Sequence, residues 1–396
     1  MSRRNREKPR SQQRLYGVDT ARAVAIAGMV MVHFGPLYPP QTLAGGLYSI
    51  SSGRASVLFA LLAGVSVSLL ATTSTAPQSP ATEHSDAGDQ AGATPPPPPA
   101  RNRARIRLLL RALPLLPLGL YLQQLDHNAL VILQYYSLYF LLAALVLGLR
   151  SERLLQTAGI VLIFGPLIYL LVATTSPHWL AQPPATLTDN PARIARDLLL
   201  TGAYPLVTWS APLLFGMWLG RRDLYGFGLR LWLLVGGAAL TVAAAIVSVL
   251  AAIPALDPES QAWEFLLSSE PHSQSFIWMS GAVGSACAVL GLMLLAAEAA
   301  PRLMWPVAAT GQLALTVYVG HIVAMHLTGN LLEREQIAGA AVTVVVFMAA
   351  AIVLSVAYRE VFRRGPLEAL LALAPEAALT AQQRLTTKGP GRDGRL

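Results

Sequence analysis

Apolar runs of about 20 residues recur from one end of this 396-residue chain to the other. A helix needs roughly that length to cross the hydrocarbon core of a bilayer. Charged residues make up only 13% of the chain, about half of their share in a soluble domain. This pattern excludes a soluble enzyme, a nucleic-acid-binding domain and a disordered protein, and it predicts an integral membrane protein.

The predicted fold class is an all-α, polytopic helix bundle. The apolar runs are too long and too rich in Leu, Ala and Val for barrel strands, so helices must satisfy the backbone in lipid. The first span is not a cleaved signal peptide, because it is long, contains Asp19 and Arg22 and lacks a small-residue cleavage site. About ten transmembrane helices are expected, over residues 18–38, 54–72, 105–122, 129–149, 153–174, 203–220, 229–253, 275–297, 305–327 and 337–358.

The distribution of basic residues predicts the orientation. With the N-terminus in the cytoplasm, all but five of the 29 Lys and Arg fall on the cytoplasmic side, as the positive-inside rule requires. Both termini of a multi-pass protein of the cell membrane then lie in the cytoplasm. The net charge of +8 is thus a signal of topology and requires no nucleic-acid partner.

Outside the spans, the chain divides by composition. The segment around Pro95 to Pro99 has almost no apolar side chain larger than Ala, so it cannot bury a core and is expected to be disordered. The tail after about residue 376 is similar, and neither segment is expected to carry chemistry. The predicted organisation is a basic cytoplasmic arm at 1–17, two spans in 18–72, a Pro-rich cytoplasmic linker at 73–104, eight spans in 105–358 and a basic cytoplasmic tail at 359–396.

The first span contains the most informative polar residues, because ionisable groups within a membrane are costly. Arg22 and His33 are eleven residues apart, which places them about 20° from the same helix face and about 16 Å apart along the axis. Asp19 lies three residues before Arg22 and can neutralise it. An acyl-CoA fits this row of polar residues, because its phosphates can bind Arg22 while its long pantetheine arm brings the thioester to His33. In the structural alternative, Asp19 caps the helix, Arg22 snorkels to headgroups and His33 bonds in the interface.

The ninth span contains a second polar set. Tyr318 and His321 share a face at i, i+3 spacing. His33 and His321 each lie about 15 residues into an outward-running helix, so they are expected at similar depth and in one shared catalytic site. The alternative is that each histidine is a structural hydrogen-bonding residue.

Polar residues near the outer ends of other spans are further candidates for substrate binding. Gln134 and Tyr135 begin the fourth span and, with Tyr136, are expected to line the same cavity, although tyrosines at this depth also form the interface belt. Arg54 opens the second span where the topology rule disfavours a cation, so it is expected to hold an anion of the substrate or of a lipid headgroup. In the same span a face of small residues predicts close helix packing: Gly64, Ser66 and Ser68.

Some classes of chemistry lack their motifs in this sequence. It has no P-loop, no HExxH pair and no dinucleotide glycine fingerprint at a plausible place, which argues against ATP-driven transport and metalloprotease activity. The single cysteine, Cys287, excludes a disulfide framework and a cysteine-based zinc site. No metal and no permanently bound cofactor is expected.

Several stretches resemble a known superfamily. The Arg-x10-His spacing of Arg22 and His33 resembles the first-helix signature of the transmembrane acyltransferase superfamily, and GRASVLFALLAG (53–64) resembles its second-helix motif. The stretch GVDTARAVAIAGMVMVHF is especially similar to bacterial relatives of heparan-α-glucosaminide N-acetyltransferase. VILQYYSLYF (131–140) and GQLALTVYVGH (311–321) look like later signatures of those relatives, and the Tyr-x-x-His within the latter is similar to a late helix of bacterial membrane O-acyltransferases.

The resemblance implies about ten helices, a cytoplasmic acyl-CoA as co-substrate and transfer of the acyl group across the membrane to a sugar hydroxyl or amine. It implies that His33 is catalytic and that Arg22 is its motif partner, with Asp19 orienting Arg22 at the donor. One departure matters: in the eukaryotic enzyme the position of His33 is Asn and the catalytic histidine lies in the first luminal loop. Residues 34–53 contain no histidine here, so the role falls to His33, to His321 or to neither.

The leading hypothesis is a membrane acyltransferase that moves a short acyl group, first of all acetyl, from acyl-CoA to an extracytoplasmic sugar or glycolipid. His33 then acts as a general base or carries the acyl group briefly, and Tyr318 and His321 position the acceptor or stabilise the oxyanion. The Arg- and Ala-rich, Lys-poor composition indicates a GC-rich bacterial genome, and hence an acceptor in the cell envelope. The alternative is a solute or lipid transporter without covalent chemistry. The oligomeric state stays open, a homodimer included.

Overall fold

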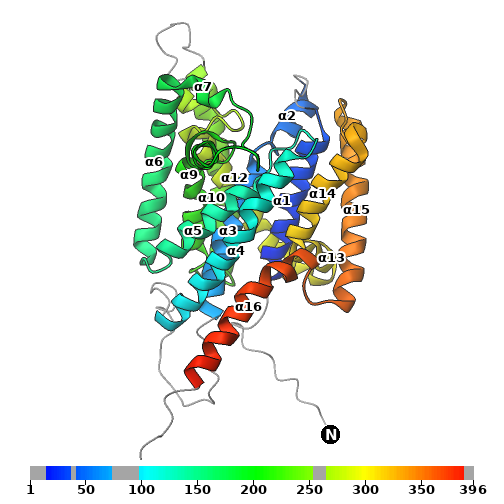
Figure 1. The fold of residues 1–396 in the computed structure, drawn as a ribbon. Coiled ribbons are helices and arrows are strands. Elements are labelled where there is room, and N and C mark those ends of the chain that lie inside the picture. The colour runs from blue at the N-terminus through cyan, green and yellow to red at the C-terminus, as the bar shows by residue number, and fades with distance from the viewer. Residues whose placement is uncertain (1–14, 37–41, 74–97, 253–264, 388–396) are drawn as a thin grey trace, which may run out of the picture.

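The structure is a computed structural model that describes residues 15–36, 42–73, 98–252 and 265–387. Within these ranges every regular element is a helix (Figure 1). The first half comprises α1 (Tyr16–Phe34), α2 (Leu43–Ser49), α3 (Arg54–Thr73), α4 (Pro98–Gln124), α5 (Leu133–Val146), α6 (Ser151–Thr175), α7 (Pro177–Leu180), α8 (Pro191–Arg196), the π-helix η2 (Asp197–Thr201) and α9 (Leu206–Leu219). The second half comprises α10 (Phe227–Ala252), α12 (Phe276–Ala299), α13 (Pro301–Gln312), α14 (Ala314–Thr328), the 3₁₀ turn η4 (Gly329–Leu331), α15 (Ile337–Val361) and α16 (Pro366–Thr387).

The predicted all-α membrane bundle is confirmed. Seven helices in the described ranges are long and apolar enough to cross a bilayer, and two bent helix pairs raise the number to nine. The expected fourth span is α5, which has 14 residues and is shorter than a bilayer crossing requires. The count of ten therefore stays a prediction.

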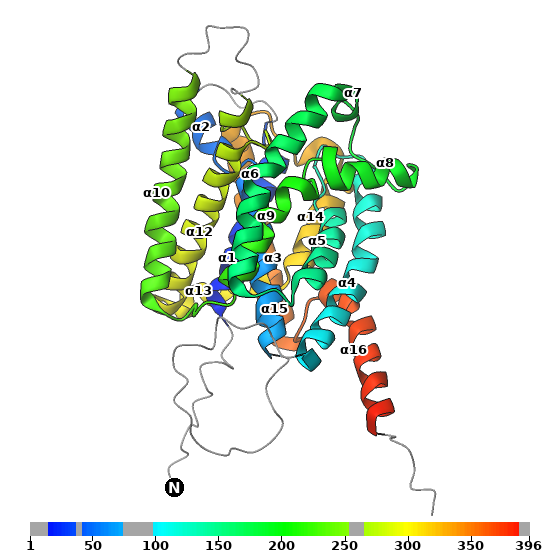
Figure 2. The ribbon, with the colours of Figure 1, turned by 90° about the vertical axis from the view of Figure 1, so that its left-hand side faces the viewer.

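Helix α1 lies at the centre of the bundle, in contact with α3, α12, α13 and α15 (Figures 1 and 2). Around this centre, α9 packs on α3, α10 packs on α12, and α6 packs on α9. The outer helices α6, α10 and α15 present exposed Leu, Ile and Val side chains. Contiguous apolar surface of this extent is costly in water and suits contact with lipid.

The small-residue face predicted in the second span forms the contact between α3 and α9. A Cβ atom at Gly64 would lie 2.1 Å from the carbonyl oxygen of Leu213, and one at Gly216 would lie 2.1 Å from that of Leu61. The hydroxyl of Ser68 donates a hydrogen bond to the carbonyl of Met217 (2.6 Å). The two backbones thus approach closely because their contact residues are small.

Two expected spans are not straight helices. The span predicted at 305–327 is the pair α13–α14, which bends by 67° at Leu313. The span predicted at 203–220 belongs to a pair over Pro191–Leu219 that bends by 58° and includes η2. The second bend coincides with Gly202 and Pro205, which are helix-breaking residues, whereas the bend at Leu313 has no proline beside it.

Helix α13 crosses α1 at very short range. A Cβ atom built on Gly311 would lie 1.7 Å from the carbonyl oxygen of Asp19 and 3.2 Å from the backbone nitrogen of Ala23. Only a glycine allows this approach, because both neighbours are backbone atoms that cannot rotate away. Gly311 lies two residues before the break at Leu313, so this crossing holds the break close to Asp19 and Arg22 of α1.

The structure moves two predicted boundaries. Helix α4 begins at Pro98, inside the segment expected to be a disordered linker, and the remainder of that segment lies outside the described residues. Most of the tail predicted at 359–396 is helical as well, since α15 ends at Val361 and α16 covers Pro366–Thr387. Helices α4 and α16 both begin with a proline in their first turn, a position where its missing N–H costs nothing.

The crossing at Gly311 yields a stability prediction. Gly311→Ala is expected to lower the free energy of unfolding by about 2 kcal/mol or more, because overpacking against fixed backbone costs on the order of 1–3 kcal/mol. The thermal midpoint of the detergent-purified protein measures the effect. Gly320→Ala is the matched control in α14, where no atom lies within 4 Å of the new methyl group. Equal midpoints for the two variants would contradict the close crossing.

Candidate active site

The predicted first-span residues face the interior of the bundle. Asp19 is buried, and its Oδ1 atom accepts a hydrogen bond from Nη1 of Arg22 at 2.5 Å. The other terminal nitrogen of Arg22 donates to the hydroxyl of Ser66 in α3, also at 2.5 Å. The guanidinium is thus fixed between α1 and α3, as the ion-pair prediction expects, and does not snorkel freely to the surface.

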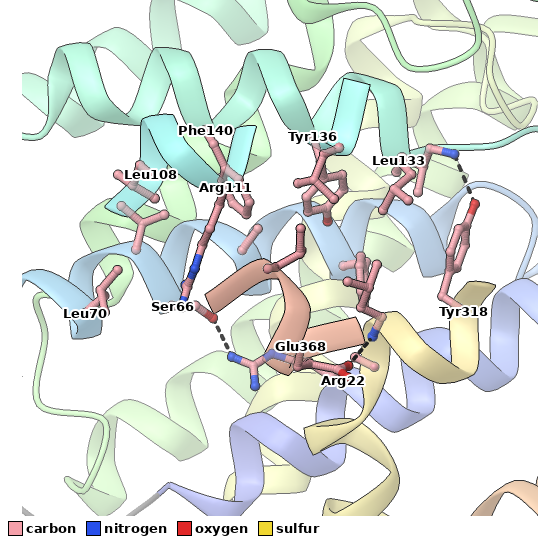
Figure 3. A pocket seen from close by; sticks show the side chains of 18 of the residues that line it. Arg22, Ser66, Leu70, Leu108, Arg111, Leu133, Tyr136, Phe140, Tyr318 and Glu368 are labelled. Carbon is pink, nitrogen blue, oxygen red and sulfur yellow. Dashed lines mark hydrogen bonds between the residues drawn. The ribbon is translucent and has the colours of Figure 1, made fainter. Parts of the chain in front are cut away.

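A cavity of about 260 Å³ lies beside Arg22. Its walls come from α1, α3, α4, α5, α13, α14 and α16, and most of its lining is apolar (Figure 3). In Figure 3, Ser66 and Arg111 lie on one side of the cavity and Tyr318 lies on the opposite side. The polar lining residues apart from the tyrosines are Arg22, Ser66, Arg111, Gln312 and Glu368.

Arg111 is the second arginine of the cavity lining. It reaches from α4 toward Ser66 (Figure 3). Arg22 has Asp19 as its partner, but Arg111 forms no hydrogen bond or ion pair with any residue that the structure describes. Arg107 and Arg364 are close enough to Arg111 to add to its positive potential, and Glu376, which forms an ion pair with Arg364, offsets part of it. A partly buried guanidinium in such surroundings favours binding of an anionic ligand.

Glu368 connects the C-terminal helix to the break in the ninth span. Its carboxylate accepts hydrogen bonds from the backbone N–H groups of Leu315 (2.8 Å) and Thr316 (3.1 Å), and from the hydroxyl of Thr316 (2.5 Å). These N–H groups belong to the first turn of α14, and the N–H groups of a first turn have no acceptor within their own helix. The carboxylate also suits the positive end of the helix dipole. Glu368 therefore caps α14 from another helix.

At the far end of the cavity, Tyr318 separates the cavity from a pair of histidines. Its hydroxyl accepts a hydrogen bond from the N–H of Ile132 (3.0 Å), and its ring packs edge-on against His321 with centroids 4.9 Å apart. Nδ1 of His33 lies 2.9 Å from Nε2 of His321. The structure thus brings together the two histidines that the sequence placed at similar depth, although the second lies in a broken span.

The remaining predicted site residues lie elsewhere. Tyr135 is buried and its hydroxyl donates to Oδ2 of Asp197 (2.7 Å), while the buried Gln134 packs on Gly119. Arg54 donates to the carbonyl of Ile50 at 3.4 Å. None of these three predicted residues lines the cavity described above, whereas Tyr136 does. A role for them in binding the acceptor stays a prediction.

The direction in which successive side chains of α5 point explains why these neighbours differ. Successive residues of a helix point about 100° apart, and in α5 it is Tyr136 whose side chain faces the cavity. Sequence reasoning missed Arg111 and Glu368. A usable signal for Glu368 exists, because Pro366 opens a helix and Leu367, Leu370 and Leu371 follow at helical spacing.

Comparison with known families agrees with this architecture. The family model described as "Heparan-alpha-glucosaminide N-acetyltransferase, catalytic" matches residues 14–231, more than half of the chain. A second model, "Protein of unknown function (DUF418)", matches residues 225–374. No curated protein matches the chain.

The fold defines a multi-pass, helical membrane protein of the transmembrane acyltransferase type. The chain belongs to the heparan-α-glucosaminide N-acetyltransferase catalytic family. Its site draws on both matched regions: Arg22 and His33 come from the first, whereas Tyr318, His321 and Glu368 come from the second. The second region therefore completes the site rather than forming a separate unit.

The trans-helix cap yields a second stability prediction. Glu368→Ala is expected to lower the free energy of unfolding by about 1–3 kcal/mol, because the buried N–H groups of α14 lose their acceptor. Glu368→Gln keeps one acceptor oxygen and is expected to lose less. Glu376 is the matched control, since its ion pair with Arg364 is exposed and an alanine there costs at most about 1 kcal/mol. Chemical unfolding in detergent measures all three; equal losses for Glu368→Ala and Glu376→Ala would exclude the cap.

Proposed function

We propose that the protein transfers an acyl group, first of all acetyl, from cytoplasmic acyl-CoA to a hydroxyl or amine of a sugar or glycolipid on the outer side of the cell membrane. The observation that carries this proposal is the order of groups along one path. Cationic Arg111 and Arg22 lie at one end of an apolar cavity, and Tyr318 with the His33–His321 pair lies at the other. Membership of an acetyltransferase family supports the same reaction class.

The donor's parts suit successive sections of this path. We place the phosphates of the nucleotide at the end of the cavity beside α4 and α16, which we call the mouth. Arg107, Arg111 and Arg364 supply positive potential there, and Glu376 offsets only part of it. The flexible pantetheine arm occupies the apolar section, where Glu368 and Asp19 are already engaged by protein groups. The thioester then arrives at Tyr318. Cytoplasmic placement of the mouth follows from the positive-inside rule.

The histidine pair supplies the acid–base chemistry. His33 takes the proton of the acceptor hydroxyl or amine as that oxygen or nitrogen attacks the thioester carbonyl. The hydroxyl of Tyr318 accepts a bond from Ile132 and keeps its own proton to donate to the developing oxyanion. The C–S bond breaks, and the CoA thiolate recovers the proton from His33. The acceptor gains the acyl group and CoA leaves as the free thiol.

Binding of the donor tests the cavity. Arg111→Gln is expected to weaken acetyl-CoA binding about tenfold, measured by calorimetry on detergent-purified protein, because one charge-assisted contact is worth on the order of 1.5–3 kcal/mol. Arg22→Gln is expected to weaken it similarly and to destabilise the protein, since Asp19 stays buried. Arg302→Gln is the control on an exposed part of α13. Unchanged affinity in Arg111→Gln would place the donor elsewhere.

Release of the CoA thiol tests the chemistry. With acetyl-CoA and glucosamine as a probe acceptor, His33→Gln is expected to lower the rate of thiol release by about 10²-fold or more, while acetyl-CoA still binds. The His33 variant retaining the wild-type rate would exclude His33 as the base. A folded wild-type protein that binds no acetyl-CoA and releases no thiol with any acceptor would favour the transporter alternative.

A further inference from the structure

We propose that His321 is a positioning residue: its hydrogen bond to His33 holds His33 in the tautomer that carries the proton on Nδ1, leaving the lone pair on Nε2 free for the substrate. The use of that lone pair rests on the proposed function. The tautomer itself is a property of the resting protein and can be measured without any substrate.

The geometry of the two rings indicates a well-formed hydrogen bond. Nδ1 of His33 and Nε2 of His321 are 2.9 Å apart, the ring centroids are 5.2 Å apart, and the ring planes differ by only 12°. The N–N distance and the two ring radii together account for the centroid separation. The rings therefore lie edge to edge in nearly one plane, which directs the N–H of one imidazole at the lone pair of the other.

The surroundings of His321 decide which ring donates. Its other nitrogen, Nδ1, is buried and forms no well-aligned hydrogen bond with a described residue. The backbone carbonyl groups of Val317 and Tyr318, one turn earlier in α14, are the polar groups close to this ring. A carbonyl oxygen can only accept a hydrogen bond, so an unprotonated Nδ1 would place its lone pair against those of two carbonyl oxygens, which is repulsive. The proton of neutral His321 therefore belongs on Nδ1. Its Nε2 is then an acceptor, and Nδ1–H of His33 must donate to it.

This arrangement leaves Nε2 of His33 as the reactive atom. Nε2 forms no hydrogen bond with any described residue, and His33 is partly exposed whereas His321 is fully buried. His321 thus has the orienting role that a carboxylate has in a Ser-His-Asp triad, where a wrong tautomer removes most of the activity. A neutral partner orients the ring without adding a charge to an apolar region. The Tyr318 ring, packed edge-on, holds His321 in place.

The tautomer can be read directly from ¹⁵N spectra of the full-length protein labelled at its seven histidines. The signals that disappear in His33→Gln belong to His33. They are expected to show a protonated Nδ1 and an unprotonated Nε2. His127 is an internal reference of the opposite kind, because its Nδ1 accepts from the N–H of Ala129 and its Nε2 lies 2.8 Å from the carbonyl oxygen of Leu122. A proton on Nε2 of His33 in the wild type would overturn the proposal.

Two substitutions separate positioning from packing. His321→Leu removes the acceptor and is expected to shift the proton of His33 to Nε2 in most molecules, whereas His321→Gln offers an amide oxygen and is expected to preserve the wild-type tautomer. His326→Leu is the matched control on the same helix, since His326 is exposed. A His33 signal that stays unchanged in a folded His321→Leu protein would overturn the proposal.

The rate of thiol release in the same two variants tests whether the tautomer of His33 matters for catalysis. His321→Leu is expected to lower kcat for thiol release by about 10- to 100-fold with KM for acetyl-CoA nearly unchanged, and His321→Gln to recover most of it. Equal losses in both variants would assign His321 a packing role and overturn the proposal. If the spectra show the expected tautomers but the wild type releases no thiol, the proposed function fails and the positioning by His321 stands.

Discussion

The site depends on the break between α13 and α14 and on the carboxylate that stabilises it. A straight ninth helix would continue past α1 and carry Tyr318 and His321 in another direction. The 67° bend instead turns α14 so that these two residues meet the end of the cavity and His33. The bend exposes N–H groups in the first turn of α14, and Glu368 of α16 accepts them. The C-terminal helix is therefore part of the site's construction.

The charged residues around the cavity differ in how they are paired within the part of the chain that the structure describes. Asp19 and Ser66 engage Arg22, and the first turn of α14 engages Glu368. Burying a charge without such partners is costly, so paired groups are the stable arrangement for an empty cavity. Arg111 forms no hydrogen bond or ion pair with a described residue, although Glu376 is near enough to act on it electrostatically. This difference supports the proposed position of the donor.

Helical periodicity and membrane thickness were sufficient to predict part of the site from the sequence. The central pair of His33 and His321 came from counting residues within two spans, and the α3–α9 contact came from the small residues Gly64 and Ser68. Features that depend on contacts between distant parts of the chain were missed. The break at Leu313 needs Glu368, 55 residues further on. The choice of Tyr136 over Tyr135 needs the exact start of α5, since one residue turns a side chain by about 100°.

Protection of a single cysteine tests the central claim, that the cavity between Arg111 and Tyr318 holds the donor. Cys287 is buried and does not line the cavity, so a Cys287→Ser protein is a suitable background for Ala63→Cys, whose site does line it. Acetyl-CoA is expected to slow modification of Ala63→Cys by a small methanethiosulfonate reagent about tenfold or more, while leaving the rate at a lipid-facing site, Gly159→Cys, unchanged. Equal rates at Ala63→Cys with and without saturating, demonstrably bound acetyl-CoA would contradict the account.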